Sequence, residues 1–446
     1  MRCKNFNFRK NYFSSISSNY VTHGLHSYTA KFIPHIPRYF IENYTKEGDI
    51  VLDPFAGSGT SLLEANILGR HSLGIDINPL AVLIGKVKTT PIKKQDLDIA
   101  QKKLFDKLDK FSVIRKANFP NIEYWFNEES ILELSKIRQS IIELYEKNEI
   151  NKKTKMFFDV CFSSIIRKSS FADPLNPKTY CSPKMKRLKE EKHKFYPIKY
   201  FKNSVIKNSK LVSGLYDSLK DKKVKSFFIP TNNTVNVELP SWAKNVDLII
   251  TSPPYANAQE YFRNFKLELF WLGLTDREGL LKLDKNQIGG ENHAALNYKD
   301  LQKTGYVDID RIIKRLFYIN KKSSYIVYKY FFNMEKAIME YQRVLKKGKH
   351  CVIVVGNNTV RGVKIPINRT LIKIAENNGF KLHDYGFDLI QNRKFMTKRN
   401  NDAEVIKRDW VIDLVKMNYP TAPRVCLRAN PPDGGAGYQI KSARRS

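Results

Sequence analysis

The sequence predicts an α/β fold: a doubly wound, mostly parallel sheet with helices on both faces, an antiparallel strand at its end, and an inserted basic region. Short apolar, β-branched runs at 50–52 and 246–250 have the character of buried parallel strands. Segments with the apolar spacing of helices alternate with such runs. About 200 residues separate the two runs, whereas a strand–helix–strand unit needs only ~30 residues, so the chain must carry an insertion.

A glycine-rich turn follows the first apolar run, with the sequence Asp-Pro-Phe-Ala-Gly-Ser-Gly-Thr at positions 53–60. Gly57 and Gly59 let the backbone turn tightly and approach a ligand before a helix begins at Thr60. A carboxylate inside such a turn repels a pyrophosphate but attracts an ammonium group. Asp53 therefore favours a cofactor with a free amino-acid group, such as S-adenosylmethionine, over a dinucleotide.

A second acidic residue follows the next predicted strand, at 71–75. Asp76 lies 23 residues after Asp53, close to the ~20-residue spacing of an acid that binds ribose hydroxyls. Asn78 is suited to cap the next helix. For Asp53 alone, a role in a strand-end turn is the commoner explanation. Together with two glycines and Asp76 in a strand–helix–strand frame, it favours cofactor binding.

The second apolar run leads into Ser252-Pro253-Pro254-Tyr255. Two prolines cannot continue a central strand, so the chain leaves the sheet along a stiff path at a carboxyl end, where open α/β sheets bind ligands. The Ser252 hydroxyl and the Pro253 carbonyl are acceptors that suit an exocyclic base amine, such as N4 of cytosine, and would free its lone pair for methylation. Tyr255 offers a face for an extruded base. A turn that only closes a strand is the alternative for the tetrapeptide alone.

The charge of the chain indicates a polyanionic partner, with nucleic acid the first candidate. The formal net charge is +33, from 77 Lys+Arg against 44 Asp+Glu. A general bias towards Lys, Asn and Ile is the alternative, but residues 151–230 hold 20 Lys+Arg and only 6 Asp+Glu. Basic and aromatic residues alternate at 168–235, which suits phosphate contact and base stacking, although a solvated loop would share this composition. We expect DNA contacts at Arg167, Lys168, Lys184, Lys186, Arg187, Arg263 and Arg393.

Other segments complete the predicted pattern. A segment at 288–293 is a second candidate for substrate contact. Residues 1–20 are expected to be poorly ordered, and residues 430–446 are expected to form a disordered tail. Lys346-Lys347-Gly348 is expected to end a long helix. Helices are expected at 37–44, 94–110, 129–147, 153–167, 323–346 and 367–378, and further strands at 351–355, 381–390 and 410–415.

The five cysteines, Cys3, Cys161, Cys181, Cys351 and Cys426, are scattered and lack a CxxC pair. This argues against a disulfide framework or a zinc site and for a reducing compartment, so we expect no metal. No apolar run approaches the ~18 residues of a membrane span, and no signal peptide is visible.

In these motifs the chain resembles the DNA amino-methyltransferases of bacterial restriction–modification systems, which methylate N4 of cytosine or N6 of adenine with S-adenosylmethionine. Positions 53–60 look like their cofactor motif. Positions 252–255 look like their catalytic motif, in the serine-first form typical of N4-cytosine enzymes. Positions 26–38 look like the segment that flanks the cofactor. The resemblance covers roughly 22–90 and 245–415 and implies a Rossmann-like methyltransferase sheet.

The resemblance also implies roles and a division of the chain. The expected domains are an N-terminal arm (1–21), a cofactor-binding half (22–167), a basic target-recognition insertion (168–240), a catalytic half (241–429) and the tail. Flipping of the target base out of duplex DNA would bring its amine to Ser252, Pro253, Pro254 and Tyr255. The implied cofactor-binding residues are Lys31, Phe32, Asp53, Pro54, Phe55, Gly57, Gly59, Thr60, Asp76 and Ile77.

Several alternatives stay open at this stage. N6-adenine methylation is second to N4-cytosine methylation, and enzymes acting on RNA bases or protein glutamine are weaker candidates. A catalytically inactive DNA-binding subunit is a different class. A cytosine-C5 mechanism needs a nucleophilic cysteine, normally in a Pro-Cys pair. The sequence has no Pro-Cys pair, so this mechanism is rejected. The expected partners are double-stranded DNA and a restriction endonuclease of the same site, in bacterial or archaeal cytoplasm at the nucleoid.

Overall fold

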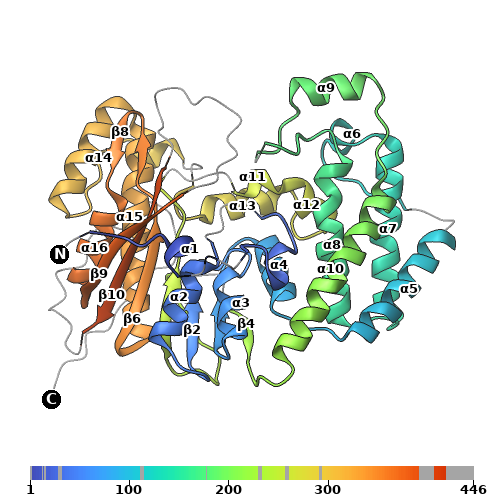
Figure 1. Ribbon diagram of the computed structural model, residues 1–446. Helices are drawn as coiled ribbons and strands as arrows, with labels where there is room; N and C mark the ends of the chain where they lie inside the picture. Colours follow the sequence, from blue (N-terminus) through green and yellow to red (C-terminus); the bar gives the residue numbers. More distant parts are fainter. Residues whose placement is uncertain are drawn as a thin grey trace, which may run out of the picture.

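A computed structural model of the chain describes residues 3–12, 14, 17–28, 33–110, 115–176, 178–229, 234–256, 261–290, 294–390 and 406–417. Its strands are β1 (Lys4–Asn5), β2 (Ile50–Asp53), β3 (His71–Gly74), β4 (Ser226–Phe228), β5 (Val246–Thr251), β6 (Leu345–Val355), β7 (Asn358–Val360), β8 (Val363–Ile365), β9 (Phe380–Leu389) and β10 (Arg408–Lys416). Helices connect most of these strands (Figure 1).

The α-helices, in chain order, are α1 (Phe8–Asn11), α2 (His35–Tyr44), α3 (Thr60–Ile67), α4 (Pro79–Lys88), α5 (Lys94–Lys110), α6 (Ile122–Trp125), α7 (Glu128–Glu146), α8 (Lys152–Ile166), α9 (Pro183–Glu190), α10 (Pro197–Leu219), α11 (Tyr261–Asn264), α12 (Lys266–Trp271), α13 (Arg277–Asn286), α14 (Val307–Ile319), α15 (Lys321–Val344) and α16 (Ile367–Asn377). Three short 3₁₀ segments are η1 (Val21–Gly24), η2 (Arg167–Ser169) and η3 (Ala295–Tyr298). None of the helices in the described ranges combines the length and apolar character of a membrane span.

The central sheet has eight strands in the order β1-β9-β10-β6-β5-β2-β3-β4. Neighbouring strands run parallel, except that β10 is antiparallel to both β6 and β9. A separate hairpin joins β7 to β8. The predicted doubly wound, mostly parallel sheet is therefore confirmed, but its antiparallel strand, β10, lies between β9 and β6 and not at the end of the sheet.

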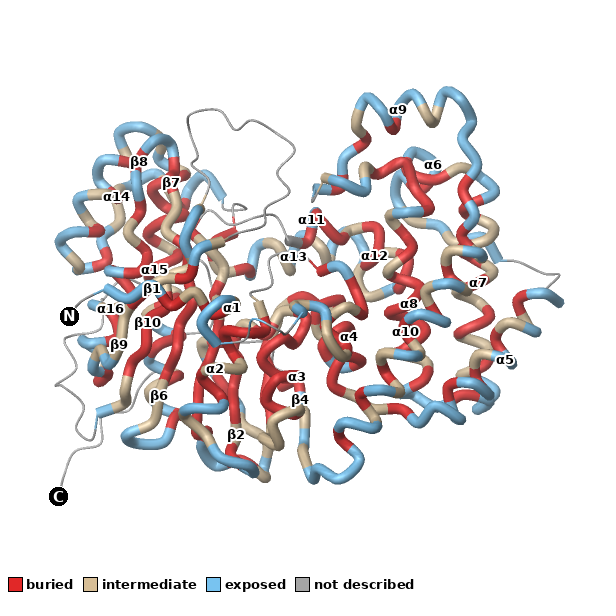
Figure 2. Tube along the Cα trace, in the orientation of Figure 1, coloured by how far each residue is buried: buried red, intermediate tan, exposed pale blue. Residues whose placement is uncertain are grey.

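Apolar helices cover both faces of the sheet. On one face, Phe40 and Ile41 of α2 pack against alternate residues of the central strands, including Leu248 and Val352. On the other face, α14, α15 and α16 pack against the intervening residues, such as Ile249. β5 is buried along its whole length, and β2 is buried except at half-buried Ile50; Figure 2 shows the burial of β2. Burial on both faces explains the continuous apolar runs in their sequences.

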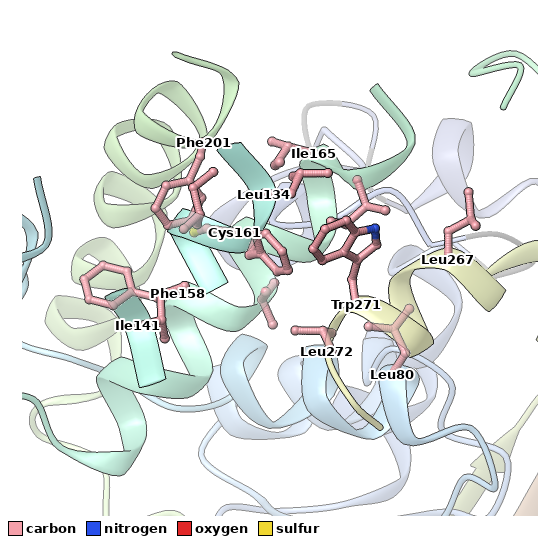
Figure 3. Close-up of a cluster of buried hydrophobic side chains, with 14 of the residues drawn as sticks. Leu80, Leu134, Ile141, Phe158, Cys161, Ile165, Phe201, Leu267, Trp271 and Leu272 are labelled. Atoms are coloured by element: carbon pink, nitrogen blue, oxygen red, sulfur yellow. The ribbon is translucent and has the colours of Figure 1, made fainter. Parts of the chain in front are cut away.

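A second core lies beside the sheet, where α5, α7, α8 and α10 pack together. Figure 3 shows Phe158 and Cys161 of α8, Leu134 of α7 and Phe201 of α10 in this core, with Trp271 of α12 among them. The chain enters this helical unit after α4 and leaves it after α10, before β4 joins the edge of the sheet. The predicted boundary at 168 thus falls inside one packed unit, between α8 and α9.

Two local predictions are wrong. Residues 3–12 are ordered, because β1 pairs with β9 and Phe8 is completely buried beside Phe6 and Phe40. Lys346-Lys347-Gly348 does not stop a helix, since α15 ends at Val344 and β6 begins at Leu345. Pairing of β6 with its neighbours prevails there over the local helix-stop signal. The expected tail at 430–446 lies outside the described residues.

Candidate active site

The two sequence motifs meet where the sheet reverses its strand order. β2 and β5 are parallel neighbours, with Leu52 opposite Ile249. From β2 the chain proceeds to β3 on one side, whereas from β5 it proceeds to β6 on the other. The loops after β2 and β5 therefore diverge and leave a crevice at the carboxyl edge, where doubly wound sheets bind their ligands.

Asp53 ties the glycine-rich turn to the proline corner. Its carboxylate is fully buried and accepts hydrogen bonds from the Thr251 hydroxyl (2.7 Å), the Ser61 hydroxyl (2.6 Å) and the backbone N–H of Phe55 (3.1 Å). Burial raises the pKa of Asp53 to about 6, although these donors favour its ionised form. Since Thr251 directly precedes Ser252, the two motifs lie side by side.

The turn itself needs glycine. Gly57 and Gly59 have φ angles of 50° and 76°, which L-residues rarely adopt. A Cβ atom on Gly59 would lie 3.0 Å from the Cα of Gly85 in α4, so the turn also packs closely against that helix. Thr60, at the start of α3, is buried behind the turn. These contacts fix the path of the backbone that faces the crevice.

Asp76 stands at the mouth of the same turn. One carboxylate oxygen accepts the N–H of Gly57 and the other accepts the N–H of Asn78, both at 2.8 Å. Burial raises the pKa of Asp76 to about 6. Each oxygen retains lone-pair capacity for a further donor. Asn78 caps α4 as the sequence predicts, by accepting the N–H of Leu80 at 3.0 Å.

A cavity of about 230 Å³ opens between these groups. Residues of both the glycine-rich turn and the proline corner line it. Pro253 and Tyr255 do not line it; Pro253 is buried and Tyr255 is half-buried. Lys31 and Phe32 lie outside the described residues. The predicted residues that line the cavity are Pro54, Phe55, Gly57, Asp76, Ile77, Ser252 and Pro254.

The other lining residues were not named as contacts from the sequence, although Tyr28 lies in the segment 26–38 that resembles the cofactor-flanking motif. Tyr28 stacks its ring on Phe265, with centroids 4.8 Å apart, and its hydroxyl accepts a hydrogen bond from the Asn78 side chain. Asn333 lies on α15 among other polar residues, such as Lys329 and Glu335, so the sequence held no signal for its place at the cavity. The predicted second contact segment reaches the cavity through Ile288, while Glu291–His293 are not described. The missed residues are Tyr28, Asn78, Thr234, Val235, Phe262, Asn286, Gln287 and Asn333.

Comparison with known proteins finds relatives that align with most of the chain. The family model described as DNA methylase, for N6/N4 methyltransferases, matches residues 3–86. The type II methyltransferase M.MvaI of Kocuria varians is 27% identical over 435 residues, covering 91% of this chain and 93% of its own. M.BsoBI of Geobacillus stearothermophilus, also a type II methyltransferase, is 27% identical and covers 82% and 80%. These similarities support a DNA amino-methyltransferase of the restriction–modification type.

Similarity to solved structures is weaker. The rRNA methyltransferase aviRa of Streptomyces viridochromogenes is 10% identical, with a TM-score of 0.32, over 91% of this chain and 95% of its own. The fold assignment therefore rests on the strand order and pairing in the methyltransferase itself.

The methyl donor of the methyltransferase is S-adenosylmethionine. The described cavity suits such a molecule on its chemistry. Asp76 offers a carboxylate that can accept further hydrogen bonds. Gly57 has no side chain, so a ligand can approach the backbone there, and the rings of Phe55 and Tyr28 offer flat apolar surface. An adenosine needs these three kinds of surface: acceptors for its hydroxyls, close backbone and apolar walls.

The predicted DNA contacts fall into two groups. Lys168, Lys184, Lys186, Arg187 and Arg263 are exposed. Figure 1 shows α9, which carries three of them, at the outer end of the helical unit on the side towards α11. Arg393 is outside the described residues.

Arg167 differs, because the chain itself occupies its guanidinium. Arg167 donates to the carbonyl oxygens of Asn176 (2.6 Å) and Asn264, and it lies 3.9 Å from the carboxylate of Glu268. These contacts join η2 to α11 and α12. Its geometry therefore indicates a positioning role between the helical unit and the catalytic half.

The close packing of the turn gives a stability prediction. We expect Gly59→Ala to lower the free energy of unfolding by about 2 kcal/mol more than Gly48→Ala, measured by urea denaturation. Both glycines have a positive φ, but a Cβ on Gly48 meets nothing within 4 Å. The matched variant thus isolates the contact with Gly85. Equal losses for the two variants would contradict close packing of the turn.

Proposed function

We propose that the methyltransferase transfers a methyl group from S-adenosylmethionine to the exocyclic N4 amine of a cytosine flipped out of duplex DNA. The observation that carries this proposal is that Ser252 and Asp76 line one cavity, while Thr251 and Asp53 join the two motifs by a hydrogen bond. The protein would be the modification enzyme of a restriction–modification system, with a cognate endonuclease that recognises the same DNA site.

The cofactor would lie along the glycine-rich turn. Asp76 would accept hydrogen bonds from the ribose hydroxyls of the cofactor. Phe55 and Ile77 would lie beside the cofactor's rings, and the backbone at Gly57 would approach the cofactor closely. The expected contacts of Lys31 and Phe32 with the methionine end belong to the same proposal. Asp53 was expected to bind the amino group directly. Because its carboxylate is buried beneath the turn and has three donors, we propose that it acts by orienting the turn.

Catalysis would depend on the proline corner. S-adenosylmethionine supplies an electrophilic methyl group. The Ser252 hydroxyl and the Pro253 carbonyl would accept the two N–H bonds of the target amine and draw its nitrogen towards a tetrahedral geometry. The nitrogen lone pair, freed from the ring, would then take the methyl group directly while the methyl–sulfur bond breaks and S-adenosylhomocysteine leaves. The methylated amine would lose one proton to solvent water. Tyr255 would stack on the flipped base.

N6-adenine methylation is the second candidate, because its amine presents the same two donors. The serine-first motif favours cytosine. Mass spectrometry of nucleosides from DNA treated with the full-length protein and S-adenosylmethionine tests the choice. We expect N4-methylcytosine. N6-methyladenine would replace the proposal with the second candidate, and no modified base together with no cofactor affinity would indicate a DNA-binding subunit.

Ser252 should act mainly on turnover. We expect Ser252→Ala to lower kcat by about 100-fold, the usual loss for one removed transition-state hydrogen bond, with less than about a threefold change in cofactor Kd. Single-turnover methylation and calorimetric cofactor binding measure the two quantities. Ser218→Ala, at an exposed position of α10, is the control. Equal loss of turnover and cofactor affinity would make Ser252 part of the cofactor site instead.

Asp76 should make cofactor binding depend on pH. Its pKa of about 6 means that the ionised, hydrogen-bond-accepting form prevails above pH 6 and is lost as the pH falls through that value. We expect affinity for S-adenosylmethionine to be roughly tenfold weaker at pH 5 than at pH 8. Asp76→Asn should bind weakly at both values. A pH dependence that survives in Asp76→Asn would assign the titration to another group, such as Asp53.

The exposed cations of α9 should contribute to DNA binding. Replacement of Lys184, Lys186 and Arg187 by Ala should weaken binding and reduce the slope of log affinity against log salt by about 2 to 3. The control removes the same charge from α5, at exposed Lys94, Lys102 and Lys110. Fluorescence anisotropy with duplex DNA at several salt concentrations measures both. An unchanged slope for the α9 variant would leave α9 as plain surface.

A further inference from the structure

Three potential metal ligands meet on the sheet away from the cavity. His350 of β6, His383 of β9 and Asp413 of β10 each offer one ligand atom, and these atoms lie within 4.8 Å of one another. His350 pairs with Leu248, four residues before Ser252, so the cluster lies about 13 Å along the strands from the catalytic corner. It is a separate site from the one proposed for methyl transfer.

The strand register explains how the three side chains meet. In the antiparallel pair of β6 and β10, Asp413 lies opposite Val352 and Val415 opposite His350, so His350 and Asp413 share the face covered by α2. Between β9 and β10 the register shifts after Asp413, and His383 is the extra residue of this bulge. A bulge turns a side chain away from regular alternation. Here it brings His383 to the other two ligands.

Contacts within the cluster hold the side chains of His350 and Asp413 in place, as contacts around metal ligands do. His350 Nδ1 lies 2.8 Å from one carboxylate oxygen of Asp413, and the Tyr44 hydroxyl donates to the other at 2.6 Å. The Tyr44 ring stacks on His350, with centroids 3.7 Å apart, and the His383 ring stands edge-on to His350 at 5.0 Å. A donor on the outer oxygen of a carboxylate is a typical device for orienting a metal ligand.

The charge balance of the cluster also favours a cation. Asp413 is 1% exposed, and among the described residues its ion-pair partner is His350, which is charged only when protonated. Its neighbour across the strand, Asp384, is paired with Lys4 at 2.6 Å. A buried carboxylate without a permanent positive charge is unfavourable. A divalent ion would supply that charge.

We propose that His350, His383 and Asp413 bind a divalent transition-metal ion of the Zn²⁺ class, with a fourth position open to water. Two imidazoles and one carboxylate suit Zn²⁺ and disfavour Mg²⁺ or Ca²⁺, which prefer oxygen ligands. Bonds of about 2.0–2.2 Å place tetrahedral ligand atoms about 3.4 Å apart. The exposed ring of His383 would close the remaining distance by rotating. The ion would join three strands and, through Tyr44, helix α2.

The test titrates Zn²⁺ into chelator-treated full-length protein by calorimetry and follows Co²⁺ binding by its visible absorption. We expect one ion per chain, micromolar or tighter affinity, and a rise in melting temperature of about 3 °C at saturating Zn²⁺. His383→Ala changes an exposed side chain and should leave folding intact. It should weaken binding at least tenfold and abolish the thermal shift.

The control is His193→Ala, which removes an exposed histidine beyond α9. This variant should bind Zn²⁺ as the unchanged protein does. Absence of binding below about 100 µM would overturn the proposal, as would binding that His383→Ala leaves unchanged. Methylation is not a readout in this experiment, so its outcome is independent of the proposed DNA substrate.

Discussion

The buried carboxylate of Asp53 is the constraint on which the candidate active site depends. Three donors converge on it from the glycine-rich turn, from α3 and from the end of β5. A carboxylate fully removed from water is strongly unfavourable unless such donors surround it. Their geometry therefore cannot relax independently. Through Thr251, this requirement holds Ser252 against a turn that lies about 200 residues earlier in the chain.

The sheet order turns this local contact into a site. β2 and β5 are neighbours only because the chain first builds β3 and β4 on one side and then crosses back. Their carboxyl ends thus meet where the loops diverge, and the two motifs face one cavity. The apolar runs at 50–52 and 246–250 were sufficient to predict both strands, since strands buried on both faces leave continuous apolar sequence.

The features that the sequence could not predict depend on distant partners. β1 is only two residues long and its strand residues are exposed; it forms because β9 offers an edge and because Phe6 and Phe8 bury their rings beside α2. Asn333 reaches the cavity from α15, which has no motif. Local helix-stop residues at 346–348 yielded to strand pairing of β6. In each case tertiary contact outweighed the local pattern.

Composition located the positive charge but not the packed unit that carries it. The basic segment begins near 168, whereas the helices that share its core begin at α5, whose pattern is that of an ordinary amphipathic helix. Arg167 illustrates the difference, because a cation in a basic segment suggested phosphate contact while its position gives it acceptors within the chain. The composition shows where positive charge is concentrated, but the neighbours of each cation in the fold determine whether it binds within the chain or faces solvent.

Arg167 and Trp271 connect that helical unit to the cavity by two independent contacts. The carbonyl of Asn264 accepts from both Arg167 and Thr179, and Trp271 of α12 is buried in the core of the helical unit (Figure 3). The same stretch contributes Phe262 to the cavity wall and Phe265 to the stack with Tyr28. A shift of the helical unit cannot occur without disturbing this wall, because close-packed cores transmit displacement instead of absorbing it. Movement of the helical unit that carries α9 would therefore also move residues that line the cavity at the proline corner.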